Sequence, residues 1–169
     1  MTIQQLYLFG CAYLVIMAVL AVLTRATFRR IAGALAGGAV AGVALLGVVA
    51  LGEGFGWWHM AITWKPYFLT LMWIDTIPCG FVFLITWRAA RRFGGHGLAV
   101  AVVVAAVLGP VRDYWYVATF PKWGAFAPGI VPALTTSVAY ATLGIFGHGT
   151  MRLVSGPATA DRLARWVDK

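Results

Sequence analysis

The stretch LAVAVVVAAVLGPVRDYWYV, residues 98–117, joins a long apolar run to two adjacent residues of opposite charge, Arg112 and Asp113. Three aromatic residues follow the pair directly. Charged groups at the end of such a run are readily solvated in water, but in lipid they are costly and usually functional. The composition of the whole chain therefore decides how the stretch is interpreted.

That composition is typical of a protein embedded in a membrane. Of the 169 residues, 62% are hydrophobic and only 11% are charged, and the mean hydropathy is +0.85. Soluble domains carry about 25% charged residues. The formal net charge of +8 comes from short basic clusters between apolar runs. This distribution indicates membrane topology rather than a nucleic-acid partner.

Apolar stretches close to the ~20 residues of a bilayer-spanning helix recur along the chain. We expect an all-α integral membrane protein, with one five-helix transmembrane domain over residues 1–150 and a short basic tail over 151–169. The first stretch is expected to stay in the protein, because no positive charge precedes it as in a signal peptide. The predicted spans cover approximately residues 4–24, 31–52, 66–87, 98–118 and 129–148.

The basic residues predict the orientation of this bundle. Two connections hold only Lys65 and Lys122, whereas the alternate connections and the tail hold ten basic residues. These are Arg25, Arg29, Arg30, Arg88, Arg91, Arg92, Arg152, Arg162, Arg165 and Lys169. The positive-inside rule then predicts a multi-pass cell inner-membrane protein with its N-terminus outside and its C-terminus cytoplasmic. The predicted outer interface is rich in aromatic residues, as an aromatic belt is. These residues are Trp57, Trp58, Trp64, Trp115, Trp123, Tyr67, Tyr114 and Tyr116.

The second span, IAGALAGGAVAGVALLG, carries Gly33, Gly37, Gly38 and Gly42 in two consecutive G-xxx-G pairs. Small residues at this spacing let helix backbones approach closely. We expect this face to pack inside the bundle, and the alternative is a contact with a second copy or another membrane protein. The two cysteines, Cys11 and Cys79, match no redox or metal motif and are expected to be buried apolar residues.

Ionisable groups inside a membrane are costly and usually functional, so they are the candidate site. Asp75 and Asp113 both fall in the outer half of the predicted bundle, with Arg112 beside Asp113. Successive helical residues point about 100° apart, so we expect Arg112 to pair with Asp75 across the helices. Asp113 would then face an outer polar cavity loosened by Pro78 and Pro110. The alternative is a structural ion pair that fixes helix register.

The other candidate residues surround this cavity. The catalytic candidates are Asp75, Asp113 and Arg112, and the candidate ligand-binding residues are Trp73, Tyr114, Trp115, His59 and Glu53. Two metal hypotheses stay open. One joins His59 and Glu53 to the two aspartates, and the other joins His96 and His148, each expected at a helix end on the cytoplasmic side. The sequence identifies no cofactor.

Two short stretches, MWIDTIP (72–78) and FPKWGAFAPG (120–129), resemble segments of the membrane subunits of copper-dependent ammonia and methane monooxygenases. They contain no ligand motif of that family, so no residue role follows from the resemblance. Two classes of function remain. The first is an enzyme or binding protein for a lipophilic small molecule such as an isoprenoid or other lipid, with an intramembrane carboxylate as acid or base. The second is a non-catalytic subunit of a membrane complex, a small transporter or a component of a metal-dependent membrane oxidase.

Overall fold

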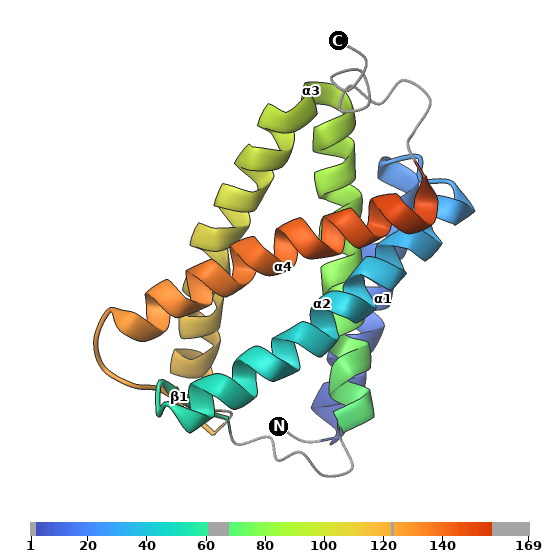
Figure 1. Ribbon diagram of the computed structural model, residues 1–169. Coiled ribbons are helices and arrows are strands. Elements are labelled where there is room, and N and C mark those ends of the chain that lie inside the picture. The colour runs from blue at the N-terminus through green and yellow to red at the C-terminus, as the bar shows by residue number, and fades with distance from the viewer. Residues whose placement is uncertain (1–2, 61–67, 123, 157–169) are drawn as a thin grey trace.

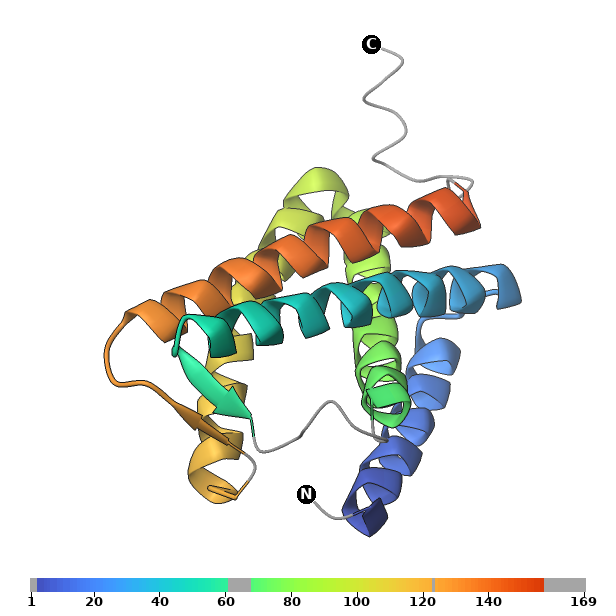
Figure 2. The ribbon, with the colours of Figure 1, turned by 60° about the horizontal axis from the view of Figure 1, so that its bottom comes forward.

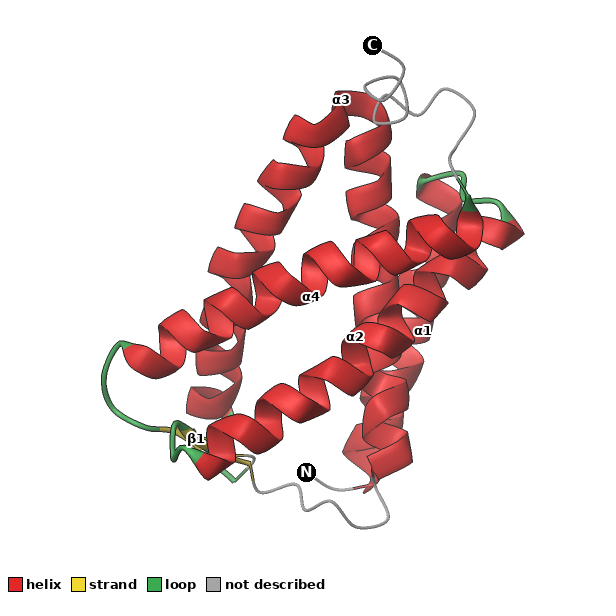
Figure 3. Cartoon of the chain, in the orientation of Figure 1, coloured by secondary structure: helices red, strands yellow, loops and turns green. Residues whose placement is uncertain are grey.

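The computed structural model describes residues 3–60, 68–122 and 124–156 as an all-helical fold with one very small sheet (Figures 1 and 3). The helices are α1 (Ile3–Leu23), α2 (Phe28–Gly54), α3 (Phe68–Thr119) and α4 (Val131–Ser155). Two helical stretches in this described part are long and apolar enough to cross a membrane, Phe28–Gly54 and Asp75–Thr119.

Helix α3 consists of two legs, because Gly94 has non-helical backbone angles (φ 67°, ψ −147°). Glycine reaches positive φ without the steric cost that a side chain imposes. The first leg, 68–93, and the second leg, 95–119, overlap the predicted third and fourth spans, 66–87 and 98–118. The sequence analysis placed a connection between these spans, whereas the structure reverses the chain at this single residue. Pro78 and Pro110 lie within the legs without ending them.

Helix ends follow local signals. Thr27 caps α2 by accepting a hydrogen bond from the Arg30 amide through its side chain, as N-cap threonines do. Pro132 lies in the first turn of α4, where its missing amide hydrogen costs nothing. Gly156 ends α4 with a positive φ of 69°. α4 therefore extends seven residues beyond the predicted span end at 148.

The sheet was not predicted. Strands β1 (Trp58–Met60) and β2 (Gly124–Phe126) pair antiparallel, with Trp58 opposite Phe126 (Figure 3). It joins the connection after α2 to the connection before α4. Three-residue strands carry too short a pattern to stand out from the surrounding aromatic and glycine residues.

Helix α2 packs against both α4 and the first leg of α3 (Figures 1 and 2). A Cβ atom at Gly37 would collide with the Gly147 carbonyl of α4, and one at Gly38 would collide with the Thr76 carbonyl of α3. The glycine face of α2 therefore packs within the chain, as the first of the two alternatives predicted.

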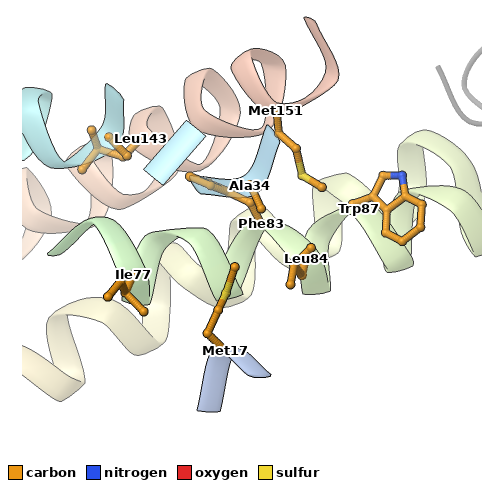
Figure 4. Packing of buried hydrophobic residues seen from close by; sticks show 9 residues of the cluster. Met17, Ala34, Ile77, Phe83, Leu84, Trp87, Leu143 and Met151 are labelled. Carbon is orange, nitrogen blue, oxygen red and sulfur yellow. The ribbon is translucent and has the colours of Figure 1, made fainter. Parts of the chain in front are cut away.

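An apolar cluster fills the space between these helices (Figure 4). Leu84 and Met151 are fully buried, and Phe83 lies against Gly147. Met17 adds a contact from α1. Cys79 packs against this cluster as expected. Cys11 does not, because it lies on an exposed face of α1, so its predicted burial is wrong.

Candidate functional site

Arg112, Asp113 and Tyr140 form a hydrogen-bonded cluster between the second leg of α3 and α4. Arg112 donates to Asp113 Oδ1 from Nε at 3.0 Å and from Nη2 at 2.8 Å. The Tyr140 hydroxyl lies 2.9 Å from Asp113 Oδ2 and 3.1 Å from Oδ1, and it also accepts a hydrogen bond from Arg112 Nη2. Both carboxylate oxygens therefore have partners, and the ion pair is tied to a second helix.

Gly109 explains how Tyr140 reaches this pair. A Cβ atom at Gly109 would collide with the Tyr140 ring, so the ring packs directly on the helix backbone at this position. Asp113 lies four residues later, which is about one helical turn or 6 Å along the axis. The Tyr140 ring packs on Gly109, and its hydroxyl forms a hydrogen bond with the Asp113 carboxylate one helical turn further along. The segment GPVRD, residues 109–113, therefore supplies both the glycine on which the Tyr140 ring packs and the two charged side chains that hydrogen-bond to its hydroxyl.

The predicted pairing of Arg112 with Asp75 is wrong. In the described part of the chain, Arg112 forms its ion pair with Asp113 and none with Asp75. The prediction considered only the directions of the Cβ atoms, which do differ by about 100° for neighbouring residues. The arginine side chain is long and flexible enough to bend along the helix surface to an adjacent carboxylate. Asp113 is consequently engaged rather than free.

Asp75 lies near the cluster of Arg112, Asp113 and Tyr140, although no hydrogen bond joins it to these residues in the described part of the chain. It is close enough to Arg112 and Asp113 to interact with both electrostatically, and likewise with Tyr13 of α1 and Cys79 of its own leg. Tyr13 forms a hydrogen bond with Tyr116 of the second leg. The guanidinium of Arg112 lies 6.0 Å from the Tyr116 ring centroid and 5.5 Å from that of Tyr140. Polar groups from α1, both legs of α3 and α4 therefore gather around Arg112.

This polar cluster, defined as Tyr13, Asp75, Arg112, Asp113, Tyr116 and Tyr140, is accessible from outside. The side chain of Arg112 is 52% exposed and that of Asp113 is 25% exposed. The hydrogen bonds of Arg112 within the described residues use Nε and Nη2. Its Nη1 group can therefore donate to a ligand that carries an oxygen acceptor.

Glu53 and His59 lie at the sheet rather than at the polar cluster. Glu53 accepts a hydrogen bond from the Met60 amide at 2.9 Å, which fastens β1 to the end of α2. Trp58 is buried and donates from Nε1 to the Val49 carbonyl at 3.0 Å. Strand side chains alternate between faces, so His59 is exposed while Trp58 faces inward.

The predicted aromatic ligand residues have different environments. Tyr114 stacks on Phe126 of β2, with ring centroids 4.3 Å apart and planes 8° from parallel. Its hydroxyl is buried with no hydrogen-bond partner among the described residues. Trp115 points outward and is 59% exposed. The side chain of Trp73 lies outside the described residues.

The described residues do not provide a set of metal ligands for the hypothesis that joins His59 and Glu53 to the aspartates, and His96 and His148 have different environments. Among the described residues, no three His, Cys, Asp or Glu side chains come together to hold a metal ion. His148 is not at a helix end, because α4 continues to Ser155. It is 2% exposed, and its Nδ1 forms a 2.9 Å hydrogen bond with Thr86 of the first leg of α3. His96, by contrast, is exposed.

The sequence analysis missed three tyrosines of the polar cluster, Tyr13, Tyr116 and Tyr140. Tyr140 had a usable signal, because it is the only ionisable residue between positions 129 and 147. Tyr116 was assigned to the aromatic belt, and Tyr13 was treated as part of an apolar span. A phenol within a span has a hydroxyl that needs a partner, as a buried tyrosine usually has.

Comparison of the chain with protein-family models, with curated proteins and with solved structures finds no match. The resemblance of residues 72–78 and 120–129 to monooxygenase subunits is therefore not supported by a family model.

Proposed function

We propose that the chain is a five-span membrane protein, with its N-terminus outside and its C-terminus cytoplasmic, that binds a lipophilic small molecule at the polar cluster. Exposed apolar side chains support the membrane placement. Along the second leg of α3, Val103, Val107 and Val111 repeat every four residues and are 61%, 57% and 61% exposed. An apolar stripe of this length is stable facing lipid and unfavourable facing water.

The arrangement of the ends supports the orientation. The α1–α2 connection, the turn at Gly94 and the end of α4 lie at one end of the fold, and the sheet lies at the other (Figure 1). Trp87 lies between Arg30 and Arg91, whose guanidinium carbons are 5.0 and 5.6 Å from the ring. Arginines distant in sequence thus meet at the end that we assign to the cytoplasm.

A labelling experiment tests this topology. Single cysteines replace Lys122 or Arg91 in a chain whose Cys11 and Cys79 are serine, and intact cells receive an impermeant thiol reagent. Lys122→Cys is expected to react and Arg91→Cys to react only after the cells are opened. Labelling with the opposite sidedness would contradict the orientation and move the polar cluster to the cytoplasmic half.

The observation that carries the ligand proposal is the accessible Arg112–Asp113–Tyr140 cluster within apolar helices. Arg112 Nη1 supplies a donor for a hydroxyl, carbonyl or phosphate oxygen, and the surrounding tyrosine rings supply apolar contact. A lipid or isoprenoid with one polar end has this combination of groups. Asp75 is the better candidate for an acid or base, because both oxygens of Asp113 already accept hydrogen bonds.

The ligand proposal is tested by mass spectrometry of what co-purifies in a mild detergent. The wild type is expected to retain a lipophilic molecule that Arg112→Gln and Tyr140→Phe lose. Tyr7→Phe is the matched control, because Tyr7 is a 60% exposed tyrosine of α1 outside the cluster. Retention of a stoichiometric protein with no small molecule would instead support a subunit of a larger membrane complex.

A further inference from the structure

A second feature, separate from the polar cluster, is a groove between the two legs of α3. It has a volume of about 630 Å³ and is lined by residues between Val82 and Phe93 on the first leg and between His96 and Leu108 on the second. The legs are joined at Gly94 and spread apart away from this turn (Figure 1). Small residues, including Ala101 and Ala105, line the second leg of the groove.

The closed end of the groove is positively charged. His96 and Phe93 line it, and the guanidinium carbon of Arg92 lies 5.2 Å from the centroid of the Phe93 ring. Arg88 is exposed about one turn earlier on the same leg. The acidic residues in the described part of the chain, Glu53, Asp75 and Asp113, belong to the sheet or the polar cluster at the other end. None of them neutralises this end of the groove.

The dimensions match an acyl chain. The lining residues of the second leg, 96–108, extend about 18 Å along the helix at ~1.5 Å per residue. One leaflet contributes about half of the ~30 Å hydrocarbon core, so a chain as long as a leaflet is deep fits within the groove. Basic pockets between helices on the cytoplasmic side are known to bind anionic headgroups.

We propose that this groove binds an anionic phospholipid of the inner leaflet, with its phosphate beside Arg88, Arg92 and His96 and an acyl chain between the legs. The apolar lining alone would accept any lipid, and the arginines make the site selective for negative charge. The inference rests on the proposed orientation, which the cysteine labelling tests independently.

The headgroup arm of the test uses native mass spectrometry of detergent-solubilised protein. The protein is given equal amounts of phosphatidylglycerol and phosphatidylcholine with identical acyl chains. The wild type is expected to retain at least five-fold more phosphatidylglycerol, and the double variant Arg88→Gln, Arg92→Gln to retain the two lipids about equally. Lys122→Gln removes one positive charge in the connection before β2 and should keep the preference.

The second part of the test uses substitutions that fill the groove and so exclude an acyl chain. Ala101→Phe or Ala105→Phe is expected to reduce phosphatidylglycerol retention several-fold while leaving the helical circular dichroism unchanged. Val103→Phe adds the same ring to an exposed position outside the groove and should retain the lipid. Equal retention of both lipids by the wild type, or full retention by both groove variants, would overturn the proposal. A dimer that Ala101→Phe dissociates would also overturn it, because a second copy would then occupy the groove.

Discussion

The interface of α2 with α4 and the polar cluster around Arg112 are held together by opposite kinds of contact. At Gly37 the two helices approach until backbone meets backbone, and a side-chain atom does not fit. At Asp113 the helices are joined through long side chains, hydrogen bonds and a half-exposed guanidinium. The first arrangement tolerates no added volume, whereas the second leaves groups available to a ligand. Changes at the interface should therefore affect stability, and changes at the polar cluster should affect binding.

The largest effect is expected for Gly37→Leu. The added side chain would force α2 and α4 apart, and overpacking a tight core costs about 3 kcal/mol at the upper end of the usual range. Thermal unfolding in detergent measures the loss. Gly47→Leu is the matched control on the same helix, because a Cβ atom there meets nothing within 4 Å. Equal melting temperatures for the two variants would show that the glycine contacts do not determine stability.

Gly109→Ala should have a smaller effect, centred on the polar cluster. The new methyl group would displace the Tyr140 ring, at a cost of about 1 kcal/mol, and weaken its hydrogen bond to Asp113. Gly144→Ala is the control, since its nearest neighbour would be Val102 Cγ2 at an ordinary 3.7 Å. That variant should gain up to about 1 kcal/mol from better helix propensity. Changes of the same sign in both variants would contradict the proposed role of Gly109.

A double-mutant cycle compares the two possible partners of Arg112. Arg112→Gln and Asp113→Asn should show a coupling of about 1 kcal/mol, as a partly exposed, well-aligned ion pair does. Arg112→Gln with Asp75→Asn should couple less, because these side chains interact only at longer range. Unfolding free energies of the single and double variants measure both couplings. A larger coupling free energy of Arg112 with Asp75 than with Asp113 would show that Asp75 is the main partner of Arg112.

Much of the helical framework was predictable, because apolar runs and their interruptions act locally. The long apolar runs predict α1, α2 and both legs of α3, and the G-xxx-G face predicts the close approach at Gly37. The reversal at Gly94 was not predicted, because residues 93–97 contain three glycines and a histidine that are equally compatible with a loop. The structure needs only one of those glycines to have a positive φ.

The charged members of the polar cluster were predicted from the sequence, but its tyrosines and its geometry were not. Asp75, Arg112 and Asp113 stand out as charges within apolar runs. Their pairing depends on how far an arginine bends and on Tyr140, which is 27 residues beyond Asp113 along the chain. Side-chain conformation and contacts between distant segments are not encoded in residue spacing. For the same reason the sequence could not show that the Glu53 carboxylate accepts a hydrogen bond from the Met60 amide of β1.

The smallest effect is expected at Trp115, one of two tryptophans that the sequence placed together and the structure separates. Trp58 and Trp115 were both assigned to the outer aromatic belt, but Trp58 is 6% exposed and Trp115 is 59% exposed. Trp115→Leu should change the unfolding free energy by less than about 0.5 kcal/mol, as substitutions at exposed positions do. Trp58→Leu should cost about 2 kcal/mol or more, because it empties buried volume and removes the hydrogen bond to the Val49 carbonyl. Thermal unfolding compares the two, and ligand retention is measured on the same samples. If Trp115→Leu keeps its stability but loses the ligand, the binding site extends from the polar cluster to the outer face of α3.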